Sequence, residues 1–256
     1  MKQTLTHKQL QILTSLYHYR FLHRHHIQQF LKNKNFAPIN RYLTDLVNKN
    51  YIHRIYSKKQ KEINNVALYY LSTKSVTLLK ETLNRTNPEL RFIYREKSRS
   101  LAFREQCLFT ADMYFQFLTS CEENGGFLEF YTKNGQRTFE YFPHPKPTAY
   151  AVLKTPKAKT KRYFLEIIND DIPRFALRSL VLKYYTYYHG GQLQENTSEP
   201  FPKMLFVCPD QLRLSFLQRF IAKTRENEEV PLSFFLGLKS DIKERGLQEN
   251  TWQRAE

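Results

Sequence analysis

The stretch Pro38-Ile-Asn-Arg-Tyr-Leu-Thr-Asp-Leu-Val-Asn48 decides the interpretation of the N-terminal part of the chain. Its apolar residues recur at helical spacing and predict one buried stripe, formed by Ile39, Leu43, Leu46 and Val47. Pro38 suits the first turn of a helix, where a missing N–H leaves no hydrogen bond unmade. The opposite face carries short polar or cationic side chains: Asn40, Arg41, Thr44 and Asn48. Such side chains contact base edges and phosphates, so this helix is predicted to fit the major groove of DNA.

Helices are predicted before this stretch and strands after it. Thr6 is placed to cap a first helix, and Arg24–Lys32 fits a second, short one. The β-rich runs Tyr51–Tyr56 and Val66–Leu71 enclose a basic tip that contains Lys58, Lys59 and Lys61. Residues 1–80 are therefore expected to form a winged helix-turn-helix domain whose wing tip contacts the phosphate backbone. Lys32 and Lys34, just before the third helix, are expected to contribute to the same contact.

The positive charge of the chain is concentrated in its first part. The chain has 256 residues and a net charge of +16. Residues 1–100 contain 19 Lys and Arg against 5 Asp and Glu, a net charge of +14, whereas the remainder has a net charge of +2. This asymmetry indicates a polyanionic partner for the N-terminal part. The alternative is a protein that is basic throughout for solubility.

The sequence predicts a cytoplasmic protein without a cofactor. The N-terminus lacks the apolar segment of a signal peptide, and no apolar run has the ~18 residues of a membrane helix. The three cysteines, Cys107, Cys121 and Cys208, are odd in number and widely spaced, and are expected to be reduced, mostly buried thiols. Four histidines gather early in the chain, at His18, His23, His25 and His26. No Cys or carboxylate lies near them in sequence, so no metal site is predicted there.

The rest of the chain predicts a helical connection and a second domain. Residues 81–122 include a long helix from Ser98, with one face formed by Leu101, Leu108, Ala111, Phe115 and Leu118. The dipeptide Asn87-Pro88 is expected to interrupt the segment before it. Residues 123–240 then show strand patterns at Phe127–Tyr131, Phe139–Phe142, Ala149–Lys154, Arg162–Ile168, Lys203–Cys208 and Val230–Leu238, with helices at Arg174–Tyr188 and Gln211–Thr224. The fold class expected is α+β, with a mixed sheet covered by helices and a frayed polar tail over residues 241–256.

Three stretches give the chain a family resemblance. They are Leu5-Thr-His-Lys-Gln-Leu-Gln-Ile-Leu13 with the wing that closes at Tyr70-Leu71, then Lys161-Arg-Tyr-Phe-Leu-Glu-Ile167, and finally Leu182–Tyr188 with Phe201–Val207. In this order and spacing the sequence resembles the replication-relaxation proteins of plasmids and integrative elements. The resemblance implies a winged helix followed by a domain similar to the PD-(D/E)xK nuclease fold. It also implies a role in replication, relaxation or transfer of plasmid or mobile-element DNA.

The same resemblance allows a nuclease site to be checked residue by residue. A metal-dependent nuclease needs carboxylates that converge on a divalent cation. Thr148 stands where the family has its first acid, and Ile168 stands where a second cluster usually ends in an acid. Glu166 remains, with Asp170 nearby and Lys183 as a cationic candidate on the next helix. The domain is therefore expected to be inactive, and Mg²⁺ is expected only if the nuclease alternative holds.

The sequence thus favours a non-catalytic protein that binds double-stranded DNA. Other replication or mobilisation proteins are the additional partners expected, and a homodimer is compatible with the role. The alternatives are a metal-dependent nuclease or nickase, and a winged helix that binds another protein.

Overall fold

We describe a computed structural model that covers residues 5–56, 66–156, 158–228 and 230–255. The chain divides into two compact units, residues 1–112 and 113–256. Helix α6 (Leu101–Glu123) contributes residues to both. The fold class is α+β, as the sequence predicted. Within the described ranges, no helix has both the length and the hydropathy needed to cross a lipid bilayer.

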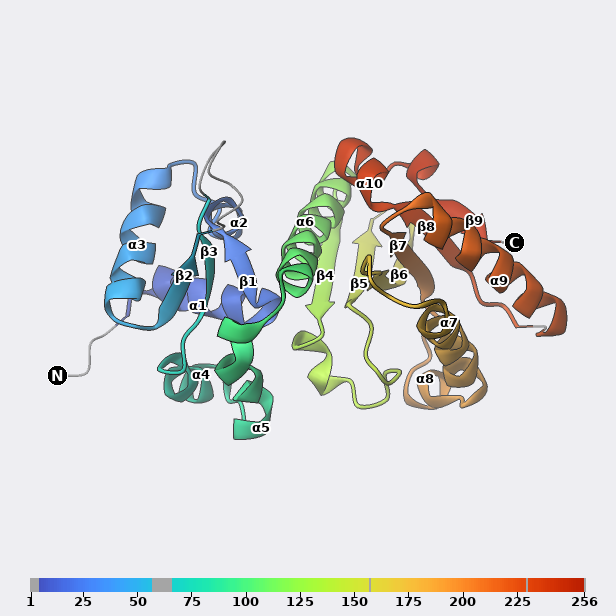
Figure 1. Ribbon diagram of the computed structural model, residues 1–256, viewed down its shortest axis with the longest axis horizontal. Helices are drawn as coiled ribbons and strands as arrows, with labels where there is room; N and C mark the ends of the chain where they lie inside the picture. Colours follow the sequence, from blue (N-terminus) through green and yellow to red (C-terminus); the bar gives the residue numbers. More distant parts are fainter. Residues whose placement is uncertain (1–4, 57–65, 157, 229, 256) are drawn as a thin grey trace. The chain divides into compact units, whose positions relative to one another are not determined.

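The first unit begins with the order of elements expected for a winged helix (Figure 1). Its elements are α1 (His7–Tyr19), β1 (Phe21–His23), α2 (Arg24–Phe30), α3 (Phe36–Asn48), β2 (Ile52–Ile55) and β3 (Leu68–Leu71). Strand β3 lies between β1 and β2 and is antiparallel to both. Strand β1 was not predicted from the sequence. It is short, and it exists because Phe21–His23 pairs with residues distant in sequence, Leu68–Tyr70.

Local hydrogen bonds explain where the first helices begin. The Thr6 side chain accepts a hydrogen bond from the backbone N–H of Gln9 at 3.3 Å, and the Gln9 side chain accepts one from the Thr6 N–H at 2.9 Å. This reciprocal pair is a capping box, so the predicted cap at Thr6 is confirmed. Helix α3 starts two residues before Pro38, because the Asn35 side chain accepts a hydrogen bond from the Ala37 N–H at 3.1 Å.

Short helices connect the wing to α6. They are α4 (Ser75–Leu83), α5 (Asn87–Leu90) and the 3-10 helix η1 (Arg91–Ser98). Helix α4 ends at Leu83, before Asn87-Pro88, as predicted. The irregular connection expected after it instead contains helix α5, whose first turn tolerates the missing N–H of Pro88. The predicted inner face of α6 is also partly wrong, since Leu101 is 55% exposed. Buried positions along α6 include Ala111, Met113 and Phe117, because the helix packs against different partners along its length.

The second unit is built on a mixed sheet with the order β4-β5-β6-β7-β8-β9. Its strands are β4 (Phe127–Thr132), β5 (Ala149–Thr155), β6 (Ala158–Ile167), β7 (Lys203–Cys208), β8 (Phe234–Leu238) and β9 (Gln253–Ala255). Strands β6, β7 and β8 are parallel to one another, and the outer pairings are antiparallel. The predicted mixed sheet is confirmed.

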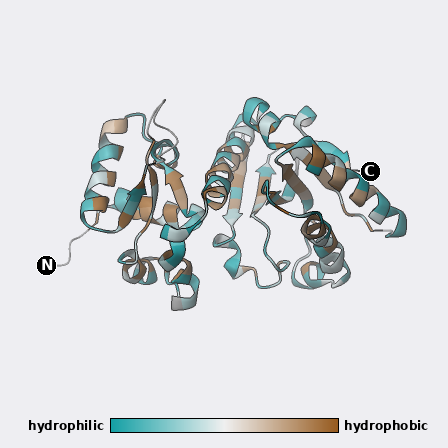
Figure 2. Cartoon of the chain, viewed as in Figure 1, coloured by the Kyte–Doolittle hydropathy of each residue, from teal (hydrophilic) through white to brown (hydrophobic). Residues whose placement is uncertain are grey.

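Helices cover both faces of this sheet. Helices α7 (Arg174–His189) and α9 (Gln211–Asn227) pack with the core of aromatic and aliphatic residues that includes Phe164 and Phe206. Phe117 of α6 packs on Tyr163, and Tyr163 points away from Phe164 because successive residues of a strand face opposite sides. Figure 2 shows the mixture of hydrophobic and hydrophilic residues along the helices that this arrangement requires.

Two predictions for the second unit are corrected. Phe139–Phe142 was expected to be a strand, but it follows the 3-10 helix η2 (Gly135–Thr138) as a loop whose apolar side chains enter the core; Phe142 is 1% exposed. The tail over residues 241–256 was expected to fray, but it continues from helix α10 (Lys239–Arg245) through η3 (Glu249–Thr251) to β9. Strand β9 is ordered by backbone pairing with β8, which requires little hydrophobicity from its own side chains.

Candidate nucleic-acid interface

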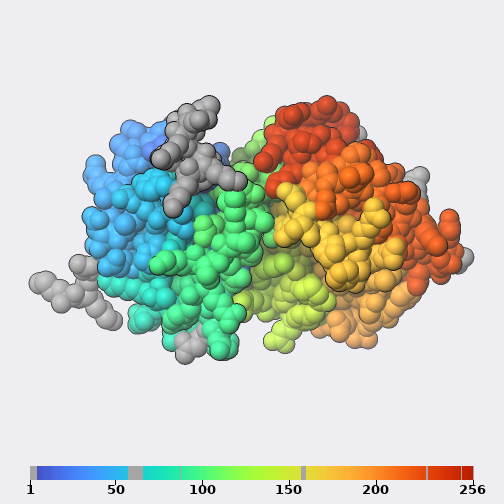
Figure 3. Space-filling view, in the orientation of Figure 1, coloured from blue at the N-terminus to red at the C-terminus, as the bar shows by residue number. Residues whose placement is uncertain are grey.

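Helix α3 presents the polar face that the sequence predicted. Ile39, Leu43 and Leu46 are buried at 0–2% exposure and fix the helix on the first unit. The opposite side chains are all exposed: Asn40, Arg41, Thr44 and Asn48. The α3 region forms part of the molecular surface in the space-filling view (Figure 3). A helix held by one face while donors and acceptors line the other is what base recognition in a major groove requires.

Arg24 connects helix α2 to this polar face. Its guanidinium donates a hydrogen bond to the Asn40 side-chain oxygen at 3.2 Å and lies 4.8 Å from the centre of the exposed Phe36 ring. These contacts place a cation beside the first turns of α3 without burying it. The position of Arg24 next to Asn40 depends on the turn between α2 and α3, so it was not included among the sequence candidates.

A groove runs between α3 and the strands that follow it. Its volume is about 540 Å³, and it is lined by Arg24, Asn40, Thr44, Arg54, Tyr56, Val66, Ala67 and Tyr69. Arg54 of β2 lies 5.6 Å from the centre of the Tyr56 ring. Arg24 and Arg54 therefore bring two cations to the groove. Helix α3 adds the Asn40 amide and the Thr44 hydroxyl, and this composition suits a phosphate-rich ligand.

The predicted lysines have two different outcomes. Lys32 and Lys34 are exposed in the turn that precedes α3. Lys58, Lys59 and Lys61 lie outside the described residues, so their contact with DNA stays a prediction. Arg54 of β2 is a further cation near the groove that was not predicted from the sequence. Its position in a predicted strand next to the lysine-rich tip could have indicated it.

In the second unit, Glu166 of β6 forms the centre of a buried polar cluster. Its side chain accepts a hydrogen bond from Lys183 Nζ at 2.6 Å and one from the Tyr184 hydroxyl at 2.8 Å. The backbone N–H and the hydroxyl of Thr148 both lie 3.3 Å from its other oxygen. Burial, and then the adjacent Glu166 carboxylate, raise the pKa of Tyr184 well above its usual value. The fold therefore brings together Glu166, Lys183 and Thr148, which the sequence analysis had grouped.

The cluster does not provide the ligands of a magnesium site. Asp170 is exposed beyond the end of β6, and its backbone carbonyl oxygen accepts a hydrogen bond from Arg213. In the described part of the chain, no group of three metal-ligating side chains forms around Glu166. Thr148 and Ile168 are both buried, and neither side chain can supply a carboxylate to a cation. Because Lys183 already neutralises Glu166, Mg²⁺ does not fit these residues as they stand.

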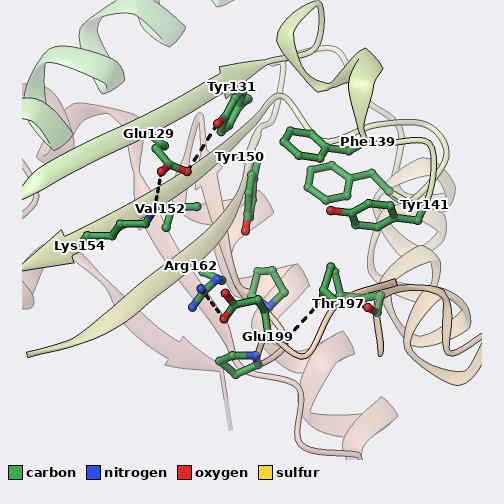
Figure 4. Close-up of a pocket in the computed structure, with 14 residues that line it drawn as sticks. Glu129, Tyr131, Phe139, Tyr141, Tyr150, Val152, Lys154, Arg162, Thr197 and Glu199 are labelled. Atoms are coloured by element: carbon green, nitrogen blue, oxygen red, sulfur yellow. Dashed lines mark hydrogen bonds and ion pairs between the residues drawn. The ribbon is translucent and has the colours of Figure 1, made fainter. Parts of the chain in front are cut away.

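A pocket of about 190 Å³ lies near this cluster in the same unit (Figure 4). Aromatic rings form one side, with Tyr131 and Tyr150 stacked at 6.1 Å between ring centres. Ion pairs between Arg162 and Glu199 and between Lys154 and Glu129 line the other side. Burial raises the pKa of Tyr150 to about 12, so its hydroxyl stays protonated. With its charges paired internally, the pocket does not present the free cations that a phosphate ligand needs.

Comparisons with known proteins leave the family open. No protein-family model and no curated protein sequence matches the chain. A structural comparison found a mutant form of ZitR from Lactococcus lactis, at 21% sequence identity, with a TM-score of 0.28. The match covers 49% of this chain and 78% of that one. At this TM-score it supports no conclusion about fold or function, and the resemblance to replication-relaxation proteins gains no support from these comparisons.

Proposed function

We propose that the first unit binds double-stranded DNA, with α3 in the major groove and the wing along the adjacent backbone. The observation that carries this proposal is the exposed polar face of α3, continuous with a groove flanked by Arg24 and Arg54. Asn40, Arg41 and Thr44 are assigned to base contacts, and the cations around them to phosphates. The net charge of +14 over residues 1–100 supplies the long-range attraction.

Salt dependence tests the electrostatic part of the proposal. Neutralising about six phosphates gives a slope near −5 in a plot of log K against log salt concentration, because each contact contributes roughly −0.9. Fluorescence anisotropy of a labelled duplex selected from random DNA measures this slope. Affinity that hardly changes between low and moderate salt contradicts the proposal, and so does co-purification of a protein partner without any DNA binding at low salt.

Substitution of Arg41 tests the recognition part. An arginine that contacts guanine through two hydrogen bonds contributes about 1–3 kcal/mol of discrimination. Arg41→Ala is expected to reduce the preference for the selected site over random DNA by roughly ten- to a hundredfold. Arg91→Ala is the matched control, because it removes one exposed cation from η1 of the same unit, outside the groove. If Arg41→Ala and Arg91→Ala change the sequence preference equally, Arg41 does not contact bases.

We infer a non-catalytic role on plasmid or mobile-element DNA, which rests on the sequence resemblance. The enzymatic alternative is a metal-dependent nuclease or nickase that uses Glu166, and the Lys183–Glu166 ion pair argues against it. A plasmid nicking assay with Mg²⁺ or Mn²⁺ separates the two. We expect no cleavage above background; cleavage that Glu166→Ala abolishes would establish a nuclease instead.

A further inference from the structure

A histidine and carboxylate cluster in the first unit is not used by the proposed function. His25 and His26 belong to α2, and Asp112 belongs to α6. One ligand atom from each of the three lies within 4.8 Å of the others. His26 is 2% exposed, His25 is exposed, and the Asp112 side chain is 41% exposed. The cluster therefore has a fixed inner member and an open side through which an ion can enter.

The distances suit a tetrahedral metal ion after small shifts. His26 Nε2 lies 2.9 Å from Asp112 Oδ1. Two ligands bound about 2.0–2.1 Å from a tetrahedral ion are separated by about 3.3 Å, so this pair needs to open by only a few tenths of an ångström. His25 must approach further, and its side chain is exposed, with a ligand atom already within 4.8 Å of the other two. Water completes the coordination, as it does in zinc sites with three protein ligands.

The ring of His25 lies against two neighbouring histidines. It stacks on His23 with 5.5 Å between ring centres, and its ring centre lies 4.0 Å from that of His26. The Asp112 carboxylate attracts a cation at this site, whereas the nearby Arg24 guanidinium repels one.

We propose that His25, His26 and Asp112 form a binding site for a divalent transition-metal ion of the zinc class. Two imidazole nitrogens and one carboxylate oxygen match the preferences of Zn²⁺ and Co²⁺ rather than those of Mg²⁺. A bound ion would join the first helix of the helix-turn-helix to α6. The site is independent of the proposed function, because it requires no DNA.

Titration with Co²⁺ tests the site directly. The full chain without a histidine tag, first treated with a chelator, is titrated with Co²⁺ while the visible absorption typical of tetrahedral cobalt is recorded, and Zn²⁺ is then added as a competitor. We expect one ion per chain, displaced by Zn²⁺. The variants are His25→Gln and Asp112→Asn, which change exposed or half-exposed side chains and leave the buried His26 in place. His7→Gln is the control, since His7 is an exposed histidine outside the cluster.

Each variant should weaken Co²⁺ binding at least about tenfold, since even residues behind the ligands contribute roughly 10- to 100-fold. His7→Gln should leave it unchanged, and circular dichroism should show that all variants keep their helices. Absence of Co²⁺ binding in the unsubstituted protein overturns the proposal. Binding that survives both His25→Gln and Asp112→Asn overturns it equally, because the ion is then held elsewhere.

Discussion

The salt bridge between Lys183 and Glu166 allows a quantitative prediction about the second unit. Both side chains are nearly buried, at 9% and 8% exposure, and their charged atoms lie 2.6 Å apart. Lys183→Met removes the cation and leaves a buried carboxylate with hydrogen bonds from Thr148 and Tyr184 only. Breaking a buried ion pair in this way costs about 3–5 kcal/mol, and the remaining donors favour the lower end. We expect a loss of about 3 kcal/mol, or roughly 6–12 °C in Tm for a unit of this size.

The double variant Glu166→Gln/Lys183→Met identifies the origin of the loss. A Gln side chain at position 166 has one accepting oxygen, which can face the Thr148 N–H, while its NH2 group donates to the Tyr184 hydroxyl, so no unpaired charge is buried. We expect the double variant to be more stable than Lys183→Met alone by about 1–3 kcal/mol, the range measured for interacting pairs. Glu166→Gln alone should cost less than Lys183→Met, because the Lys183 ammonium keeps its hydrogen bond to the Pro145 carbonyl oxygen at 3.1 Å.

Urea unfolding followed by tryptophan fluorescence measures these differences. The chain has one tryptophan, Trp252, and it belongs to the second unit, so the signal reports on that unit alone. Lys161→Met is the control, because Lys161 is an exposed lysine on the same strand as Glu166. It should change stability by less than about 0.5 kcal/mol. An unchanged midpoint for Lys183→Met, or a double variant whose loss equals the sum of the single losses, would refute the assignment of a buried, coupled pair.

Two further predictions concern stability. Burial, followed by the charge of Arg85, lowers the pKa of His18 from 6.5 to about 4. Between pH 6.5 and 4 the unfolded chain therefore binds more protons than the folded chain, and stability should fall as the pH falls through this window, by up to about 3 kcal/mol from His18. His18→Gln should flatten the pH profile of thermal unfolding. An unchanged profile would contradict the assignment. A Cβ on Gly126 would lie 2.6 Å from the Lys154 carbonyl oxygen, so Gly126→Ala should destabilise the second unit by about 1–3 kcal/mol in urea unfolding. Gly125→Ala is the comparison, because an added Cβ would meet open space there, although φ is +61°. It should cost about 1 kcal/mol. A larger loss for Gly125→Ala than for Gly126→Ala would contradict the steric explanation.

Features that depend on local patterns could be predicted from the sequence. The buried stripe of α3 and its polar face follow from helical spacing, and Thr6 is recognisable as a cap from its residue type and position. Strand β7 was predicted with its observed bounds, Lys203–Cys208, because it is a continuous apolar run in the middle of a parallel arrangement. Helical spacing also predicts that Asn40 and Arg41 lie opposite the buried stripe, and both are exposed.

Features that depend on contacts between distant residues could not be predicted. Strands β1 and β9 exist through backbone pairing, which leaves little trace in side-chain composition. The aromatic residues of Phe139–Phe142 indicated burial correctly, but a loop can bury such side chains as well as a strand can. Asp112 lies 86 residues from His26 in the chain, so the sequence around the histidines could not show that a carboxylate lies beside them. Arg24 and Arg54 line the same groove for the same reason, since they are 30 residues apart in the chain.

The Glu166 cluster and the His25, His26 and Asp112 cluster are expected to respond differently to an added cation. A metal ion at Glu166 would have to displace Lys183 and find a second carboxylate, where the structure offers the hydroxyl of Thr148. An ion at His26 and Asp112 needs a small opening of one pair and a rotation of the exposed His25. Any effect of a divalent transition metal on this protein is therefore expected to arise at the His25, His26 and Asp112 cluster of the first unit rather than at Glu166 of the second.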